Sequence, residues 1–285
     1  MMSLAGTVSR RQMDRDLILR ARQVAPGVLR QPLGKRLSGP AAVAIVVAVV
    51  IYCAADLKIV QQLYLGGFDR LERLVSAMFP PNPGIDPLGL LQSLSATFAM
   101  AIVGTLLGAL GALPLGLLSA RTVMKNAAFH FVVRRVMDLF RGVPALVWAL
   151  ILVAAFGLGP FAGVIALALA EIPRLGKLFG EALENVDDRP AEALRATGAG
   201  WLQTLRLAVF PQVAPVWLSQ CLYFLEQNFR AAAVLGIVGA GGIGFELEER
   251  IRIYAFDEVM FIVILFVVSV GVLDWLSERL RARLV

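Results

Sequence analysis

Cysteine, histidine and charged residues are all scarce in this chain of 285 residues. It holds two cysteines and one histidine, and only 17% of its residues are charged. Cys53 and Cys221 both lie in apolar stretches, which excludes a disulfide framework and a paired-cysteine metal site. A single histidine, His130, excludes any site that needs two histidine ligands. We therefore expect no metal site.

A phosphate-binding P-loop is also missing. Residues 34–35 and 176–177 are Gly-Lys pairs, but neither has the upstream glycine or the following Ser or Thr of GxxxxGK[ST]. Residues 239–244 match GxGxxG, yet this fingerprint binds a dinucleotide only between a strand and a helix of a βαβ unit. Here it follows an apolar run. If ATP drives this protein, another chain binds it.

Apolar residues make up 58% of the sequence, and the mean hydropathy is +0.75. Soluble domains average roughly 45–50% apolar residues, so we predict an all-α integral membrane protein. About 20 apolar residues span a bilayer. Six segments approach this length, which predicts six transmembrane helices: about 40–55, 88–120, 143–159, 161–179, 213–243 and 259–275. The predicted organisation is a basic cytoplasmic tail (1–39), a first transmembrane helix (40–56), an external loop (57–87), a five-helix core (88–280) and a short cytoplasmic tail (281–285).

The net charge of +6 is a topology signal once the chain is assigned to a membrane. Alternate loops carry 21 and 6 basic residues, so the richer side and both termini are predicted to be cytoplasmic. A nucleic-acid partner is not expected. The tail carries eight basic residues and no apolar stretch typical of a signal peptide, so we expect it to remain on the mature protein. It is either an amphipathic interfacial segment or a disordered tail.

Small and ionisable residues inside the apolar segments are the first candidates for special roles. Gly104, Gly108 and Gly111 form a small-residue stripe, for which packing within one subunit is favoured over a dimer contact. An intramembrane Glu171 is functional by default, although it is also spaced to pair with Arg174.

Arg230 follows Glu226 at i, i+4, near the predicted outer end of the fifth helix. A structural or gating role is favoured over recognition of an oxyanion by its guanidinium. The glycines of 235–245 are expected to break a helix at the outer face and form a gate. The candidate pore or gate residues are Glu171, Glu226, Asn228, Arg230, Gly239, Gly241, Gly242 and Gly244.

The cytoplasmic loop at about 180–211 is the most informative stretch. Pro190 suits the first turn of a short helix, and Gly198 and Gly200 end it. Such a helix fits a groove on another protein, although a helix lying on the membrane has a similar pattern. A second amphipathic turn, 201–209, leads to the next predicted span.

The loop also resembles a known signature. Glu192-Ala193-Leu194, three residues, Gly198, nine residues and then Ala208-Val209-Phe210-Pro211 is similar to the EAA motif of ABC-importer permeases, which docks into the ATP-binding subunit. Leu194, Ala208 and Phe210 depart from the common Ala, Ile and Leu but stay apolar. The resemblance implies that the ATPase-coupling residues are Pro190, Glu192, Ala193, Leu194, Gly198 and Pro211.

From about Ser93 onward the chain resembles the phosphonate permease family more narrowly. The similar stretches are 141–150, 159–163, 228–244 and 273–281, while Ala145 and Glu171 depart from that family's pattern. The resemblance implies a type I ABC importer permease (MetI-like) fold in a bacterial inner membrane. It also implies a pore of two copies, two ATP-binding subunits and a periplasmic or extracellular substrate-binding protein.

The implied substrate is phosphonate or a related phosphorus oxyanion, phosphite or phosphate. No cofactor is expected on this chain, because ATP and Mg would be bound by the partner ATPase. A permease of the same superfamily for another small solute, such as methionine, is the alternative. A membrane-embedded enzyme is disfavoured, because Glu171 is the only deep acid and no second carboxylate shares its face.

Overall fold

The computed structural model describes residues 33–57, 66–122, 124 and 126–284, and every regular element among them is helical. The chain divides into two units, 1–73 and 74–285, which are described separately. In the first, α2 (Leu33–Asp56) contains the predicted first span, with its apolar part at Ala42–Asp56. Most of the predicted tail lies outside the described residues. Helix α4 (Phe68–Ala77) lies within the predicted external loop, so this connection is partly helical.

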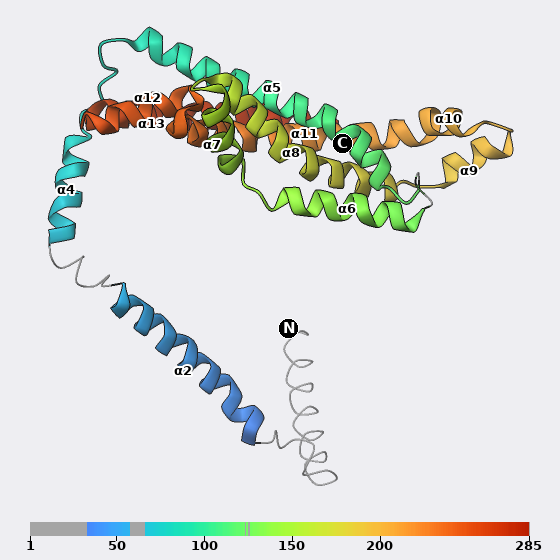
Figure 1. Cartoon of the computed structure of the whole chain (residues 1–285), viewed down its shortest axis with the longest axis horizontal. Helices are drawn as coiled ribbons and strands as arrows, with labels where there is room; N and C mark the ends of the chain where they lie inside the picture. The colour runs from blue at the N-terminus through green and yellow to red at the C-terminus, as the bar shows by residue number, and fades with distance from the viewer. Residues whose placement is uncertain (1–32, 58–65, 123, 125, 285) are drawn as a thin grey trace, which may run out of the picture. The chain divides into compact units, whose positions relative to one another are not determined.

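Long helices form the body of the second unit, and short ones cap its two ends (Figure 1). Helices α5, α8, α11 and α13 lie lengthwise, with α9 and α10 at one end and α12 at the other. The elements are α5 (Pro87–Ser119), α6 (Ala127–Arg141), α7 (Ala145–Phe156), α8 (Pro160–Glu184), α9 (Arg189–Ala196), α10 (Trp201–Thr204), the π-helix η2 (Leu205–Val209), α11 (Phe210–Leu235), the π-helix η3 (Gly236–Ala240), α12 (Ile243–Arg252) and α13 (Phe256–Arg281).

Helices α5 and α8 pack closely because glycines leave room on α5. A Cβ atom added at Gly104 would lie 2.8 Å from the Leu167 Cβ, and one at Gly108 would lie 2.9 Å from the Glu171 Cβ. Both distances are shorter than real side-chain contacts, so a larger residue would push the helices apart. The favoured interpretation of the glycine stripe, packing within one subunit, is confirmed.

Aromatic contacts attach α11 to its neighbours. The rings of Phe179 on α8 and Trp217 on α11 lie 4.9 Å apart, and the Trp217 indole donates a hydrogen bond to the Phe179 carbonyl at 3.3 Å. Farther along α11, Phe229 lies 4.5 Å from Phe98 on α5 and 5.4 Å from Phe266 on α13, measured between ring centroids. Such pairs add to apolar burial, so they fix α11 between α5 and α13.

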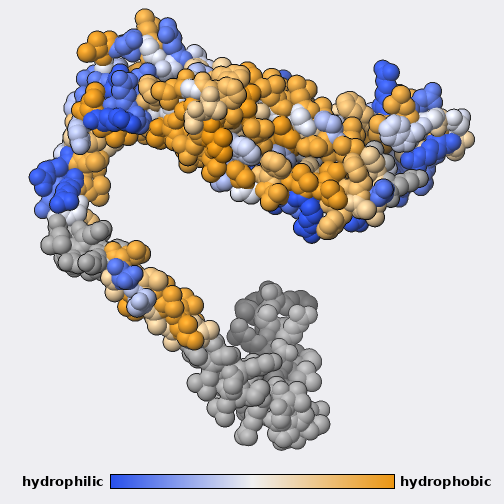
Figure 2. Space-filling model, in the orientation of Figure 1, coloured by the Kyte–Doolittle hydropathy of each residue, from blue (hydrophilic) through white to orange (hydrophobic). Residues whose placement is uncertain are grey.

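Apolar side chains also cover the outside of this unit, as expected for helices in lipid (Figure 2). Within the described residues, three stretches are long and apolar enough to cross a membrane: 87–119, 201–240 and 256–281. A bent pair, α6 with α7, raises this number to four. The count of six spans therefore stays a prediction.

The third predicted span, 143–159, differs from the structure. Helix α7 has 12 residues, or about 18 Å at 1.5 Å per residue, and it is bent by 77° from α6. The stretch between the second and third predicted spans contains the 15-residue α6, which carries His130. A turn at 142–144 ending in Pro144 separates the two helices. The apolar run alone could not reveal α6, because five of its 15 residues are polar and they interrupt the apolar sequence.

Candidate functional site

A helical hairpin connects α8 to α11, and we call residues 185–209 the coupling hairpin. Helix α9 begins after Asp188 and has Pro190 in its first turn, as the sequence predicts. Along this helix Ala191 is buried, whereas Glu192 and Ala193 are exposed. The EAA-like residues therefore present an acidic and small-residue face to the outside.

Gly198 closes α9 with a left-handed turn. Its φ is +84°, its N–H donates to the Arg195 carbonyl at 3.0 Å, and the Ala199 N–H donates to the Leu194 carbonyl at 3.2 Å. These two bonds make a Schellman motif, which satisfies carbonyls at a helix end and favours glycine at the left-handed position. The predicted helix stop at Gly198 is confirmed, whereas Gly200 has an ordinary φ of −70° and precedes α10.

Hydrogen bonds and an ion pair fasten the base of the coupling hairpin. The Asp187 N–H donates to the Gln212 Oε1 at 3.3 Å, one residue after Pro211 at the start of α11. At the end of α8, Glu184 accepts bonds from the Arg121 N–H at 2.9 Å and the Arg134 guanidinium at 2.8 Å. Gln212 therefore ties the hairpin to α11, and Glu184 ties the end of α8 to α6 and to the turn that precedes α6.

The outer end of the hairpin exposes large apolar side chains. Trp201 and Leu202 are 62% and 69% exposed. In Figure 2 this end is mostly hydrophilic, unlike the apolar body of the second unit. Exposed apolar residues among polar ones are typical of a surface that binds another protein.

Glycines interrupt the chain between α11 and α12, as predicted, and we call residues 236–244 the gate segment. Positive φ values occur at Gly239 (+94°), Gly241 (+77°) and Gly242 (+73°). Residues with a Cβ rarely adopt this conformation. The helix therefore ends in a π-helical turn, and the chain re-enters as α12.

Three neighbours enclose the gate segment. The Gly239 carbonyl accepts a hydrogen bond from the Gly159 N–H at 2.9 Å, and the Ile243 N–H donates to the Thr97 Oγ1 at 2.8 Å. A Cβ at Gly244 would lie 1.7 Å from the Ala233 carbonyl oxygen, which only glycine avoids. Irregular backbone at membrane depth is tolerated where protein surrounds it in this way.

Arg230 joins two helices through carboxylates. Its Nη2 lies 2.6 Å from the Glu226 Oε1, which confirms the predicted i, i+4 pair, and 2.9 Å from the Asp274 Oδ2 on α13. Glu226 also lies 3.5 Å from Arg281. Asp274 is near the C-terminal end of α13, opposite the end that α12 contacts through Arg250 and Glu258. Arg230 nevertheless lines a cavity together with Ile237, Ile243 and Gly244 of the gate segment, so it lies beside that segment, and the expectation that it lies near the outer end stays a prediction.

Glu171 and Asn228 are buried between helices. Glu171 is 2% exposed, and Arg174 donates to its Oε1 at 3.1 Å, so the predicted i, i+3 pair is confirmed. Asn228 is 1% exposed and donates to the Thr105 Oγ1 on α5 at 2.9 Å. Each of these buried side chains therefore has a hydrogen-bond partner, which lies on the same helix for Glu171 and on α5 for Asn228.

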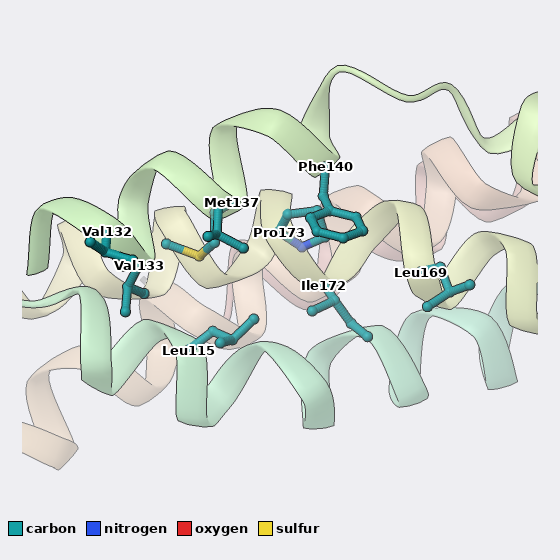
Figure 3. Close-up of a pocket in the computed structure, with 9 residues that line it drawn as sticks. Leu115, Val132, Val133, Met137, Phe140, Leu169, Ile172 and Pro173 are labelled. Carbon is teal, nitrogen blue, oxygen red and sulfur yellow. The ribbon is translucent and has the colours of Figure 1, made fainter. Parts of the chain in front are cut away.

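Two cavities of similar size differ in what they can hold. A groove of about 320 Å³ between α5, α6 and α8 is lined by apolar side chains, including Leu115, Met137 and Ile172 (Figure 3). A second cavity, of about 420 Å³, is lined by Arg141, Arg174, Lys177, Leu178, Glu181 and Phe224. An apolar groove cannot desolvate an anion without replacing its lost hydrogen bonds, so of these two only the second suits an oxyanion.

Neither Arg141 nor Lys177 is distinguished in the sequence from the other basic residues of the predicted cytoplasmic side. The pattern Arg174-x-x-Lys177 places both side chains on one helix face, but the approach of Arg141 depends on how α6 packs on α8. Among the described residues, no group of three or more His, Cys, Asp or Glu is arranged to hold a metal ion.

Comparisons with known proteins agree with this architecture. Residues 112–285 match the family described as binding-protein-dependent transport system inner membrane component. The phosphite transport system permease protein PtxC of Stutzerimonas stutzeri is 38% identical over 217 residues, which cover 76% of this chain and 78% of that protein. The phosphate-import permease protein PhnE of Mycolicibacterium smegmatis is 42% identical over 214 residues, but the match spans only 40% of that longer relative.

Methionine transporters are also similar, at lower identity. The probable D-methionine transport system permease protein MetI of Haemophilus influenzae is 26% identical over 158 residues, which cover 52% of this chain and 74% of that protein. An inward-facing structure of the MetNI methionine ABC transporter matches with a TM-score of 0.62 at 23% identity, over 70% of this chain and 99% of that one. At this identity the structural match establishes the fold alone.

Proposed function

We propose, from the premise that this chain belongs to the family of binding-protein-dependent transport system inner membrane components, that it moves phosphonate, phosphite or phosphate across the inner membrane. The chain is a permease and not an enzyme. The observation that carries the substrate class is the 38% identity to a phosphite permease over three quarters of both chains. Similarity to a methionine permease is lower and covers about half of this chain.

The coupling hairpin supports the proposal that a separate ATPase drives transport. The described residues of α9 and α10 project from one end of the second unit and expose Trp201 and Leu202 there (Figure 1). Pro190, Glu192, Ala193, Leu194 and Gly198 stand where the EAA motif has its docking residues. Their helix is short and closed by glycine, so it can enter a groove on a partner protein.

Two copies of the chain, two ATP-binding subunits and an external binding protein would form the complete importer. ATP and Mg would lie on the ATPase subunits. The end of the permease that carries the coupling hairpin would face the cytoplasm, because the ATPase works there. The gate segment, at the opposite end, would then face the binding protein, and both chain termini would be cytoplasmic.

The transport cycle would use the rigid base of the hairpin. Closure of the ATPase pair would displace α9, the Asp187–Gln212 contact would pass this displacement to α11, and α8 would follow because the chain runs directly from it into the hairpin. Helix α11 continues directly into the gate segment. A single helix therefore links the docking surface to Gly239, Gly241, Gly242 and Gly244.

Uptake measurements test the function. The permease is produced with its ATPase and binding protein in cells that lack other transporters for these solutes, and uptake of phosphate, phosphite, methylphosphonate and methionine is compared. We expect ATP-dependent uptake of at least one phosphorus oxyanion and none of methionine. Uptake of methionine alone would contradict the proposed substrate class but not the family.

A further inference from the structure

We infer that the cavity lined by Arg141, Arg174 and Lys177 is a transient binding station for the transported oxyanion. This inference rests on the proposed function and names residues that would act in it. The cavity measures about 420 Å³, which is ample for a phosphonate or phosphate group with several water molecules. Its three cations come from two helices, α6 and α8, that are separate in sequence.

Arg174 is oriented by its neighbour. Glu171, which is buried, accepts one hydrogen bond from the Arg174 Nη1 at 3.1 Å. A guanidinium has five N–H donors in a planar fork, so most of those on Arg174 remain for another acceptor. The side chain is 36% exposed and lines the cavity, as expected of a group held by a buried anchor and offered to a ligand.

Lys177 is held in a similar way from α6. Its Nζ lies 3.0 Å from the Asp138 Oδ1, and Asp138 also lies 3.5 Å from Arg135. An ammonium group has three donors, so Lys177 can bind Asp138 and an oxyanion together. The pair also fixes α6 to α8, which keeps the cavity open between them.

Arg141 is the distinctive cation of the three. It ends α6 and lines the cavity, and among the described residues no carboxylate lies within ion-pair distance of it. The side chain is exposed, and its charge acts on the Asp138 carboxylate only from beyond ion-pair distance. Its guanidinium is therefore free to bind a phosphorus oxyanion in the cavity with paired hydrogen bonds.

The balance of charge suits passage rather than tight retention. The carboxylates of Glu171 and Asp138 are already paired with Arg174 and Lys177, which leaves Arg141 and Glu181. Glu181 lies seven residues beyond Arg174 on α8, about 10 Å along the helix. An anion bound near Arg141 and Arg174 therefore avoids most of the repulsion from the Glu181 carboxylate. Binding must be weak enough for the ligand to leave, and a local positive charge beside a carboxylate meets that need.

A neighbouring cavity offers the anion an exit route from the cation-lined cavity. This neighbouring cavity measures about 300 Å³ and shares Leu178 and Glu181 with the cation-lined one. Its polar lining includes Gln212 and Gln220, and the buried Oε1 of Gln220 has no hydrogen-bond partner within the described chain. Gln212 belongs to the base of the coupling hairpin, so the two cavities form a path from the cation cluster toward the cytoplasmic end.

Reconstituted importers test the inference. The permease, its ATPase and its binding protein are placed in liposomes, and uptake of radiolabelled phosphate or phosphite is measured beside binding-protein-stimulated ATP hydrolysis. The variants are Arg141→Gln and Arg174→Gln, with Arg174→Lys as a conservative change. Arg279→Gln is the control, because it removes a charge from an exposed residue in the last turn of α13 that lines neither cavity.

We expect both glutamine variants to lower uptake about tenfold while stimulated ATP hydrolysis stays near normal, because the drive is intact and the station is lost. Arg174→Lys should recover part of the uptake, and Arg279→Gln should match the parent. Unchanged uptake in both glutamine variants, or an equal loss in Arg279→Gln, overturns the station. A parent complex that carries no phosphorus oxyanion overturns the proposed function instead, so the two failures are distinguishable.

Discussion

The backbone N–H of Ile243 donates a hydrogen bond to the hydroxyl of Thr97, 2.8 Å away and 146 residues earlier in the chain. This bond ties the last part of the gate segment to α5. Both groups are buried, so the bond is made out of reach of water. Thr97 therefore has a structural role in an otherwise apolar helix, because its hydroxyl accepts the hydrogen bond of the Ile243 N–H.

Removing the Thr97 hydroxyl should loosen the gate segment. In Thr97→Val the Ile243 N–H loses its acceptor while the volume is kept, which should cost about 1–3 kcal/mol. Amide exchange at Ile243 should rise by about tenfold or more, because each 1.4 kcal/mol changes an equilibrium tenfold. Ser95→Ala is the control, since Ser95 is exposed and bonds only the carbonyl of Gln92 in its own helix. Equal exchange in the two variants would argue against this role of Thr97.

Gly244 should tolerate no larger residue. The Cβ atom of Gly244→Ala would lie 1.7 Å from the Ala233 carbonyl oxygen, which belongs to rigid backbone. We expect a loss of at least about 1–3 kcal/mol and poor yield of folded protein, measured as the thermal unfolding temperature in detergent. Gly271→Ala is the matched control, because no atom lies within 4 Å of a Cβ there and α13 gains a better helix former. Equal unfolding temperatures would contradict the packing of the gate segment.

Much of the fold follows from the sequence, because hydropathy and small-residue spacing are local properties. The predicted second span, 88–120, corresponds to α5, and the glycine stripe, the stop at Gly198 and the Glu226–Arg230 pair are all confirmed. These features depend on residues within one or two helical turns of each other, or on a backbone angle that glycine favours.

Other features depend on contacts between distant segments. Asp274 meets Arg230 from another helix, and Arg141 reaches the cavity because α6 packs on α8. Neither relation leaves a pattern in local sequence. The amphipathic α6 was also missed, since its charged residues suggested a loop. Charge near an apolar run indicates a side of the membrane but does not exclude a helix there.

Gly198 should be more sensitive than Gly200 although both lie in the coupling hairpin. Gly198 has a φ of +84°, whereas Gly200 has a φ of −70° that any residue adopts. Gly198→Ala should cost about 1 kcal/mol at this turn and weaken docking of the ATPase. Co-purification of the ATPase should fall for Gly198→Ala and stay normal for Gly200→Ala. Equal co-purification would mean that the Schellman turn is not needed for docking.

Arg230 should act as a structural tie between α11 and α13. Arg230→Gln leaves the Glu226 and Asp274 carboxylates without their shared cation, and we expect a loss of about 1 kcal/mol because these groups are partly exposed. Adding Asp274→Asn should restore part of that stability, since one of the unpaired charges is removed. A double-mutant cycle of thermal unfolding measures this coupling. Additive losses would contradict the tie.

Glu171 should affect uptake indirectly, by orienting the guanidinium of Arg174. Its carboxylate is buried and holds one edge of the Arg174 guanidinium at 3.1 Å, while the Gly108 position leaves space for its side chain. Glu171→Gln keeps the shape but weakens that bond, so Arg174 should be less well oriented and uptake of phosphorus oxyanion should fall severalfold at normal protein level. Glu278→Gln is the control for charge alone, because Glu278 is exposed on α13 and lines neither cavity. If Glu171→Gln transports normally, Arg174 does not depend on the buried carboxylate for its orientation.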